Sequence, residues 1–170
     1  RGSIIQLIQH SKDLSKEFES SVQASGGSGK NLRGAKHRFE SYATPSWRFS
    51  VHFDSLCHVA THLSTRKDSD LVDYADDFFR AADVEARLNM AAVADFSQDC
   101  LQFTRWLDDE AVESSELQVT CADLAKKLVV LYQQGKFVQV GCTAAVIKDL
   151  KSVRLFTLKN GSVITVGGPS

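Results

Sequence analysis

The sequence has almost no proline, no long apolar run and no closely paired cysteines. Only Pro45 and Pro169 occur among its 170 residues, so proline interrupts no helix between them. Its longest apolar runs, as in KKLVVLYQ, are far shorter than the roughly 18 residues that a transmembrane helix needs. These absences favour helices and predict no membrane span.

The four cysteines, Cys57, Cys100, Cys121 and Cys142, form no CxxC pair. Paired thiolates of that spacing are typical of structural zinc sites, so the sequence does not favour such a site. Each cysteine lies among apolar residues, where a free thiol packs as a small hydrophobic side chain. Since the first residues also lack the apolar segment of a secretory signal, we expect a reducing, intracellular and cytoplasmic location.

Charge is unevenly distributed, although the net charge is only −1. Residues 1–67 carry ten basic and five acidic side chains (+5), residues 68–123 carry three and fifteen (−12), and residues 124–170 carry seven and one (+6). This order is not typical of a general nucleic-acid-binding protein. Folding could still gather the two basic ends on one face, so nucleic-acid binding stays open.

Apolar residues recur three or four positions apart over most of the chain, which predicts amphipathic helices. The first helix is expected over residues 4–22, with Ser11 inside it. Thr44 is typical of an N-cap and Pro45 of a first helical residue. They predict a second helix that begins there and runs to Leu63.

The same spacing predicts helices in the middle and C-terminal parts of the chain. We expect them over residues 69–80, 84–107, 120–134 and 137–151. Thr120 and Asp123 form a variant of the capping box, which would begin the third of these. Gly135 would end it, because glycine commonly follows the last helical residue.

The C-terminal stretch VRLFTLKNGSVITV contains two β-rich runs around Asn160-Gly161. This pattern predicts a β-hairpin over residues 153–166 with a two-residue type I′ turn. An isolated hairpin is marginally stable, so it must pack on the helices or pair with another chain. We expect one all-α domain over residues 1–170: a helical bundle or helical-hairpin stack of five to seven helices with this short hairpin.

The stretch ASGGSGKN, residues 24–31, has the glycines and the Gly-Lys pair of a phosphate-binding loop. Such a loop needs a serine or threonine hydroxyl after the lysine to bind magnesium, and Asn31 stands there instead. It should also follow a strand, whereas a helix is expected before it. The stretch therefore predicts a flexible Gly/Ser loop and no nucleotide binding.

Basic residues follow this loop: Lys30, Arg33, Lys36 and Arg38. Their charges could hold the phosphates of a nucleic acid or of a membrane surface, or an acidic protein partner. The alternatives are a solvated segment, or contact with the acidic middle of the same chain. These four residues are our candidate anion- or partner-binding segment.

Asp70, Asp73, Asp76 and Asp77 form a carboxylate-rich face on the helix predicted from residue 69. Their spacing lacks the glycine and the final glutamate of an EF-hand loop, so calcium binding is not predicted. Carboxylates near a helix start suit the helix dipole and are often simply solvated. They are also our candidate face for a basic partner.

His58 and His62 lie four residues apart, so they would share one helix face. The sequence HVATH lacks the glutamate of the metalloprotease motif, and no third ligand is evident. We therefore expect surface histidines, no metal and no cofactor. No nucleophile with a base in a recognisable motif is present either, so no catalytic residue is predicted.

These patterns favour a non-enzymatic helical module for protein–protein interaction or oligomerisation. Charge segregation, the lack of a catalytic set and the open edge of the predicted hairpin support this hypothesis. The alternative is an RNA- or DNA-binding protein that uses the basic N- and C-terminal segments. A third hypothesis is an enzyme whose site is assembled from scattered residues.

Overall fold

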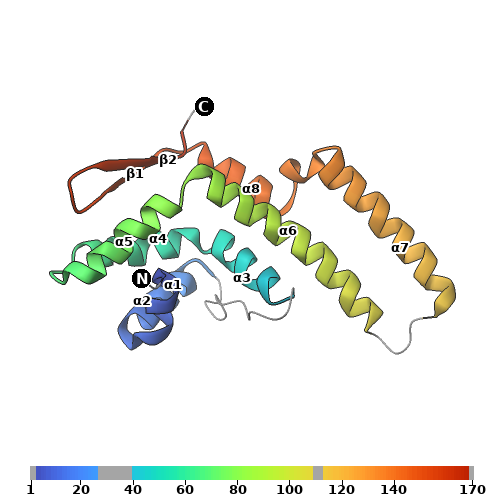
Figure 1. The fold of residues 1–170 in the computed structure, drawn as a ribbon, viewed down its shortest axis with the longest axis horizontal. Coiled ribbons are helices and arrows are strands. Elements are labelled where there is room, and N and C mark those ends of the chain that lie inside the picture. Colours follow the sequence, from blue (N-terminus) through green and yellow to red (C-terminus); the bar gives the residue numbers. More distant parts are fainter. Residues whose placement is uncertain (1–2, 27–39, 109–112, 169–170) are drawn as a thin grey trace.

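The computed structural model of the chain describes residues 3–26, 40–108 and 113–168. Within them it contains eight α-helices and one two-stranded antiparallel sheet (Figure 1). They are α1 (Ile4–His10), α2 (Lys12–Ala24), α3 (Glu40–Val51), α4 (Phe53–Ser64), α5 (Ser69–Ala81), α6 (Val84–Leu107), α7 (Ser114–Leu128), α8 (Gly141–Leu150), β1 (Arg154–Thr157) and β2 (Val163–Val166). The all-α class with a C-terminal hairpin is confirmed, with one helix more than the expected range.

The predicted first helix is two helices, because Ser11 ends α1 and begins α2. Its N–H donates to the Leu7 carbonyl at 2.9 Å, and its hydroxyl accepts from the Leu14 N–H at 3.4 Å. Serine competes with the backbone for hydrogen bonds and therefore favours N-cap positions over helix interiors. The apolar face continues across the break, since Ile8 and Leu14 are both buried.

The predicted helix over residues 44–63 is also two helices, α3 and α4, with the buried His52 between them. α3 begins at Glu40, so the predicted start at Thr44 and Pro45 is wrong. Pro45 lies inside the N-terminal half of α3. There the missing N–H removes one backbone hydrogen bond without ending the helix.

α7 begins six residues before the predicted N-cap, so Thr120 lies inside the helix and the predicted capping box is wrong. Glu113 has the extended backbone of the N-cap position instead. After α7 comes a π-helical turn, Val129–Gln133. Gly135 then adopts the left-handed conformation with φ +71°, which confirms its predicted role after the helical segment. A 3-10 helix, Lys136–Gln139, leads into α8.

The predicted hairpin is confirmed, but its turn is longer than expected. β1 and β2 pair in antiparallel register with Thr157 opposite Val163. Leu158 N–H then donates to the Ser162 carbonyl at 2.8 Å. The turn therefore holds one residue more than the predicted type I′ turn, and Gly161 supplies the positive φ of +79°.

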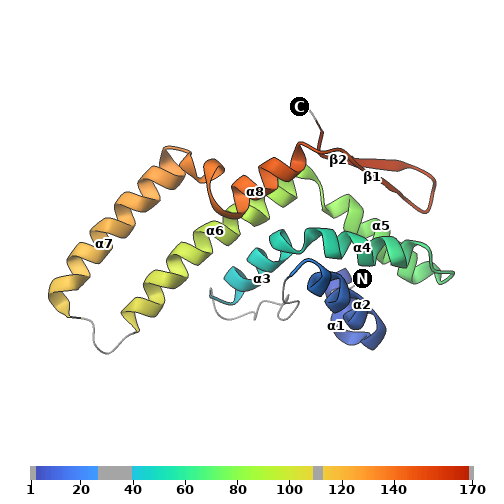
Figure 2. The same cartoon turned by 180° about the vertical axis from the view of Figure 1, so that it is seen from behind.

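The core consists of two clusters that the hairpin connects. The larger cluster is formed by α1, α2, α4 and α5, where Phe18, Leu56 and Leu63 are almost completely buried. Figure 2 shows α2 lying against α4, and α1 contacts α2 and α5. The smaller cluster joins α6, α8 and β2. Phe156 and Ile164 of the hairpin pack against both clusters, and Phe156 stacks on Phe79 with ring centroids 4.3 Å apart.

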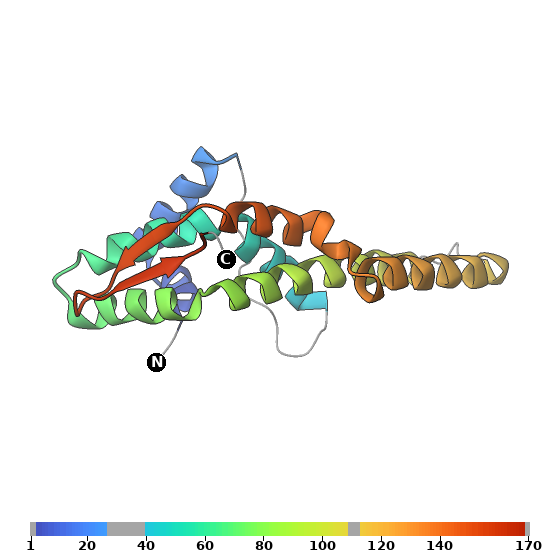
Figure 3. The same cartoon turned by 90° about the horizontal axis from the view of Figure 1, so that it is seen from above.

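One part of the molecule projects from the rest. α3 packs along α6, and beyond α3 only the end of α6 and α7 continue outward as a thin layer (Figure 3). We call α7 and the neighbouring α6 segment, residues 96–107, the arm, and the remaining described elements the body. No helix within the described ranges is long and apolar enough to cross a membrane.

Candidate interaction site

The predicted basic segment of Lys30, Arg33, Lys36 and Arg38 lies outside the residues that the structure describes. Most of the glycine-rich stretch lies outside them as well. Its first residue, Ala24, is the last residue of α2. A helix therefore precedes the stretch, as the sequence predicted, and a phosphate-binding loop would need a strand there.

The predicted acidic face lies on α5, and the hairpin of the same chain covers part of it. Lys159 Nζ lies 3.3 Å from Asp73 Oδ1, and the Lys159 N–H donates to both carboxylate oxygens of Asp76 at 3.2 Å. Asp70 and Asp77 are exposed beside them. Two of the four carboxylates thus help to dock the hairpin, which leaves a smaller acidic surface for any partner.

Basic residues of the C-terminal segment also pair with acidic residues of the body and the arm. Arg154 bonds to Asp54, and its Nη2 lies 2.5 Å from Asp149 Oδ1. Lys127 Nζ on α7 lies 2.6 Å from Asp99 Oδ1 on α6. The basic–acidic–basic order of the sequence is therefore partly neutralised inside the fold.

His58 and His62 lie on one face of α4, as the spacing predicted, with Glu17 of α2 between them. Glu17 Oε1 is 3.5 Å from His58 Nε2 and 3.2 Å from His62 Nδ1. His62 Nε2 lies 2.9 Å from Arg66 Nη2. No group of three or more histidine, cysteine or acidic side chains among the described residues could hold a metal ion. The pair joins α2 to α4 instead.

All four cysteines are free thiols. Burial raises the pKa of Cys57 to about 12. Burial and the carboxylate of Asp95 raise the pKa of Cys142 to about 11. Only a small fraction of either thiol would ionise near neutral pH, so neither has the thiolate character of a reactive cysteine. Cys121 is the exposed one, and it lies in the middle of α7.

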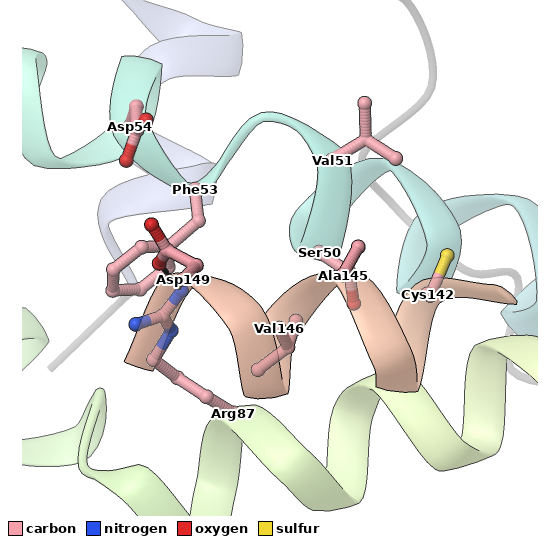
Figure 4. Close-up of a pocket in the computed structure, with 9 residues that line it drawn as sticks. All are labelled: Ser50, Val51, Phe53, Asp54, Arg87, Cys142, Ala145, Val146 and Asp149. Carbon is pink, nitrogen blue, oxygen red and sulfur yellow. Dashed lines mark hydrogen bonds and ion pairs between the residues drawn. The ribbon is translucent and has the colours of Figure 1, made fainter. Parts of the chain in front are cut away.

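A cavity of about 270 Å³ between α3, α4, α6 and α8 is lined by the buried Arg87 and by the carboxylates Asp54 and Asp149 (Figure 4). Arg87 stacks over the Phe53 ring, 3.8 Å from its centroid, and its Nη2 lies 2.5 Å from Asp149 Oδ2. Asp149 in turn accepts from Arg154, which also bonds to Asp54. Two arginines and two aspartates neutralise one another here, and they join α4, α6, α8 and β1. The arrangement suits a structural network better than a ligand site.

Asp95 fixes the start of α8 against α6. Its carboxylate accepts from the N–H groups of Cys142 and Thr143 at 2.8 Å each, and from the Thr143 hydroxyl at 2.8 Å. These N–H groups have no partner within their own helix, so the carboxylate acts as an N-cap supplied by another helix. Gly141 has φ +63°, and a Cβ there would lie 2.3 Å from Asp95 Oδ1. Glycine is therefore required at this contact.

The base of the arm is held by aromatic contacts and one ion pair. Tyr132, in the π-helical turn, contacts Phe96 of α6 edge to face with ring centroids 5.3 Å apart. It also stacks on Phe137 at 5.6 Å. The pair between Lys127 and Asp99 lies beside these rings. These contacts set α7 alongside α6 in antiparallel direction (Figure 1).

Further along the arm, apolar side chains face solvent. None of the described side chains of α7 is buried. Leu117 is 39% exposed and Val119 61%, while Leu107 at the end of α6 is 43% exposed. Leu124 and Leu128 are partly covered. Exposed apolar side chains on a projecting element are typical of an interaction surface.

An apolar groove of about 670 Å³ lies where the arm meets the body. Its lining includes Trp47 and Val51 of α3, Tyr132 and Phe137, and Val140 before α8. Trp47, Val51 and Val140 are each more than two-fifths exposed. The exposed apolar surface of the arm therefore continues onto the body.

The sequence interpretation missed this surface, although one signal for it is present. Leu117, Cys121, Leu124 and Leu128 lie alternately four and three residues apart, which is the spacing of a coiled-coil seam. Because the helix was expected to begin at Thr120, the first position of the seam fell outside it.

No known protein family matches this chain, and neither does any curated protein or solved structure compared with it.

Proposed function

We propose that this chain is a non-enzymatic helical module for protein–protein interaction or oligomerisation, and that the arm is its interaction surface. The observation that carries the proposal is the exposure of apolar side chains along a helix with no buried side chain among those described. Burial of such side chains against a partner is favourable by about 25 cal/mol for each Å² removed from water. Binding of a partner would thus bury the apolar side chains that the arm leaves exposed.

The distribution of charge supports the same proposal. In the body, the most buried arginine is paired, and so is the arginine that shares its carboxylate partner. The described thiols with the most strongly raised pKa values are protonated near neutral pH. These arginines of the body are therefore already paired within the chain, whereas apolar side chains of the arm are exposed and available to a partner. This division is typical of a protein that binds through one projecting element.

The test compares the wild-type chain with Leu117→Gln/Val119→Gln, which makes the arm polar but keeps helix-compatible side chains. Tagged protein is cross-linked in cell extract, and bound proteins and oligomers are quantified by mass spectrometry. We expect the arm variant to lose most of the bound material. Equal capture by wild type and variant would contradict the proposal.

A matched control is Leu155→Gln/Val163→Gln, which changes two apolar residues on the outer side of the hairpin. Leu155 is 65% exposed and Val163 55%, so these substitutions alter exposed surface to a similar extent. The control should bind as the wild type does. If the hairpin variant alone lost binding, the open edge of the hairpin would be the interaction surface instead of the arm.

A further inference from the structure

The outer end of the arm is strongly acidic. Residues 105–123 carry six acidic side chains and one basic side chain, which gives a net charge of −5. Among the described acids, Asp108, Glu113 and Glu116 are exposed. None of these three forms an ion pair with a basic side chain of the described residues. Their charge is therefore available to a partner of opposite sign.

The acids at the start of α7 lie between exposed apolar side chains. At about 100° per residue, Glu116 and Glu113 lie about 60° and 120° around the helix from Val119. Leu117 lies about 160° around in the same direction. We call Glu113 and Glu116 the acidic pair. A segment that carries both basic and apolar side chains matches the surface formed by the acidic pair, Leu117 and Val119.

The same side of α7 leads toward the apolar groove at the base of the arm. Lys127 lies about 80° around from Val119 in this direction, and it lines the groove. Its charge is already paired with Asp99 at 2.6 Å, and the other carboxylate of the groove, Asp95, caps α8. The groove therefore offers mainly apolar surface, such as the exposed ring of Trp47.

We infer that the arm binds a basic amphipathic helix of a partner protein along this side of α7. Its basic residues contact the acidic pair, and its apolar residues enter the groove. The inference rests on the proposed function and names the class of the partner. Amphipathic helices commonly bind in grooves between helices through apolar anchor residues. A nucleic acid or an anionic membrane fits this surface poorly, because the acidic pair repels phosphate groups.

The length of such a helix follows from the length of α7. Glu113 and Lys127 are 14 residues apart, or about 21 Å at 1.5 Å per residue. A partner helix of about 18 residues would therefore extend from the acidic pair into the groove.

The first test uses two synthetic amphipathic peptides of about 18 residues with the same leucine positions. One has lysine and the other has glutamate at the polar positions. Fluorescence anisotropy measures the binding of each labelled peptide to the full chain. We expect the lysine peptide to bind at least about tenfold more tightly, with an affinity that falls at high salt because of screening. Equal binding of both peptides, or binding of neither, would overturn the inference.

The second test removes the acidic pair. Glu113→Gln/Glu116→Gln should weaken binding of the lysine peptide about tenfold and reduce its salt dependence. The matched control is Asp70→Asn/Asp77→Asn, which removes two exposed acids of α5 and should leave the affinity unchanged. Loss of affinity in the control alone would place the basic partner on α5 and overturn the inference. Circular dichroism checks that both variants keep their helices.

The third test reports on the groove. Trp47 and Trp106 are the two tryptophans of the chain, so Trp106→Phe leaves the groove residue Trp47 as the only source of indole fluorescence. The lysine peptide, which itself lacks tryptophan, should shift this emission to shorter wavelength because it covers the exposed ring. Val51→Gln, which makes the groove lining more polar, should weaken binding several-fold. Unchanged emission at saturating peptide would contradict the position of the partner in the groove.

The two proposals fail in different ways. If Leu117→Gln/Val119→Gln loses bound material from cell extract while the wild-type chain does not distinguish the two peptides, the basic partner is overturned and the proposed function stands. If the chain alone doubles its mass in sedimentation and no longer binds the lysine peptide, a second copy occupies the arm and the inference is likewise overturned. If the arm variant loses neither partners nor oligomers, the proposed function is overturned as well.

Discussion

The body and the arm contain the same kinds of apolar and charged side chains, but they bury these side chains to different extents. In the body, Leu56 and Leu63 are fully buried and Arg87 is both stacked and paired. In the arm, Leu117 and Val119 of α7 are exposed to solvent, and Leu124 and Leu128 are only partly covered. The body can be stable alone because its apolar area is already removed from water. α7, which has no buried side chain among those described, contributes little to that stability, so its exposed apolar residues are better explained by what binds to them.

The largest expected effect is the difference in stability cost between truncating a buried leucine of the body and truncating an exposed leucine of the arm. Leu56→Ala opens a cavity in the larger cluster and should lower the free energy of unfolding by about 3 kcal/mol. Leu117→Ala removes the same atoms from the exposed arm and should cost less than about 0.5 kcal/mol in dilute protein. Urea unfolding measures both. Similar costs for the two variants would show that the seam is already buried in the isolated chain.

The stability costs of Leu117→Ala and Leu56→Ala should also depend differently on protein concentration. If the arm mediates self-association, the cost of Leu117→Ala should grow as concentration rises, because the variant then also loses the stabilisation that association provides. The cost of Leu56→Ala should change far less. A cost for Leu117→Ala that is independent of concentration would contradict a role of the seam in association.

The second comparison is between a buried arginine of the body and an exposed arginine of the arm. Arg87→Met keeps much of the apolar stem but removes the cation over Phe53 and the partner of Asp149, so it should cost about 3 kcal/mol. The control Arg105→Met changes an exposed arginine of the arm and should stay within about 0.5 kcal/mol. Thermal unfolding followed by circular dichroism distinguishes them. A small effect of Arg87→Met would mean that Arg154 alone satisfies the carboxylate.

The pH dependence of stability should come from the body. The pKa of Cys57 is raised by burial from 9.0 to about 12, so above pH 9 the unfolded chain releases a proton that the folded chain keeps. Stability is therefore full below pH 9 and falls as pH rises toward 12, by about 1 kcal/mol at pH 10 for this thiol. Cys57→Ala should flatten that decline.

The matched control for this titration is Cys121→Ala, which removes the exposed thiol of the arm. Unfolding midpoints in urea, measured from pH 8 to pH 10.5, compare the two variants with the wild type. If both variants flatten the decline equally, burial of Cys57 is not its cause.

Local patterns of the sequence predicted most elements, because apolar spacing and turn residues act within a few positions. The long helix α6 and the hairpin are examples. The breaks at Ser11 and His52 were missed, since the apolar face continues across each of them. The contact of Asp95 with the start of α8 joins residues 47 positions apart, and no local pattern indicates it. The seam of α7 can be predicted from the sequence only if the start of the helix is predicted correctly.

The smallest expected effects concern two ion pairs whose lysines are about half exposed. Lys127→Ala breaks the 2.6 Å contact with Asp99, a largely covered carboxylate, and should cost up to about 1 kcal/mol. Lys159→Ala breaks the 3.3 Å contact with Asp73 on the body and should cost less than about 0.5 kcal/mol. Unfolding at low and high salt measures both, since screening reduces each pair. If Lys127→Ala costs nothing, the ring contacts of Tyr132 alone hold α7 beside α6, and the arm is orientated by packing rather than by charge.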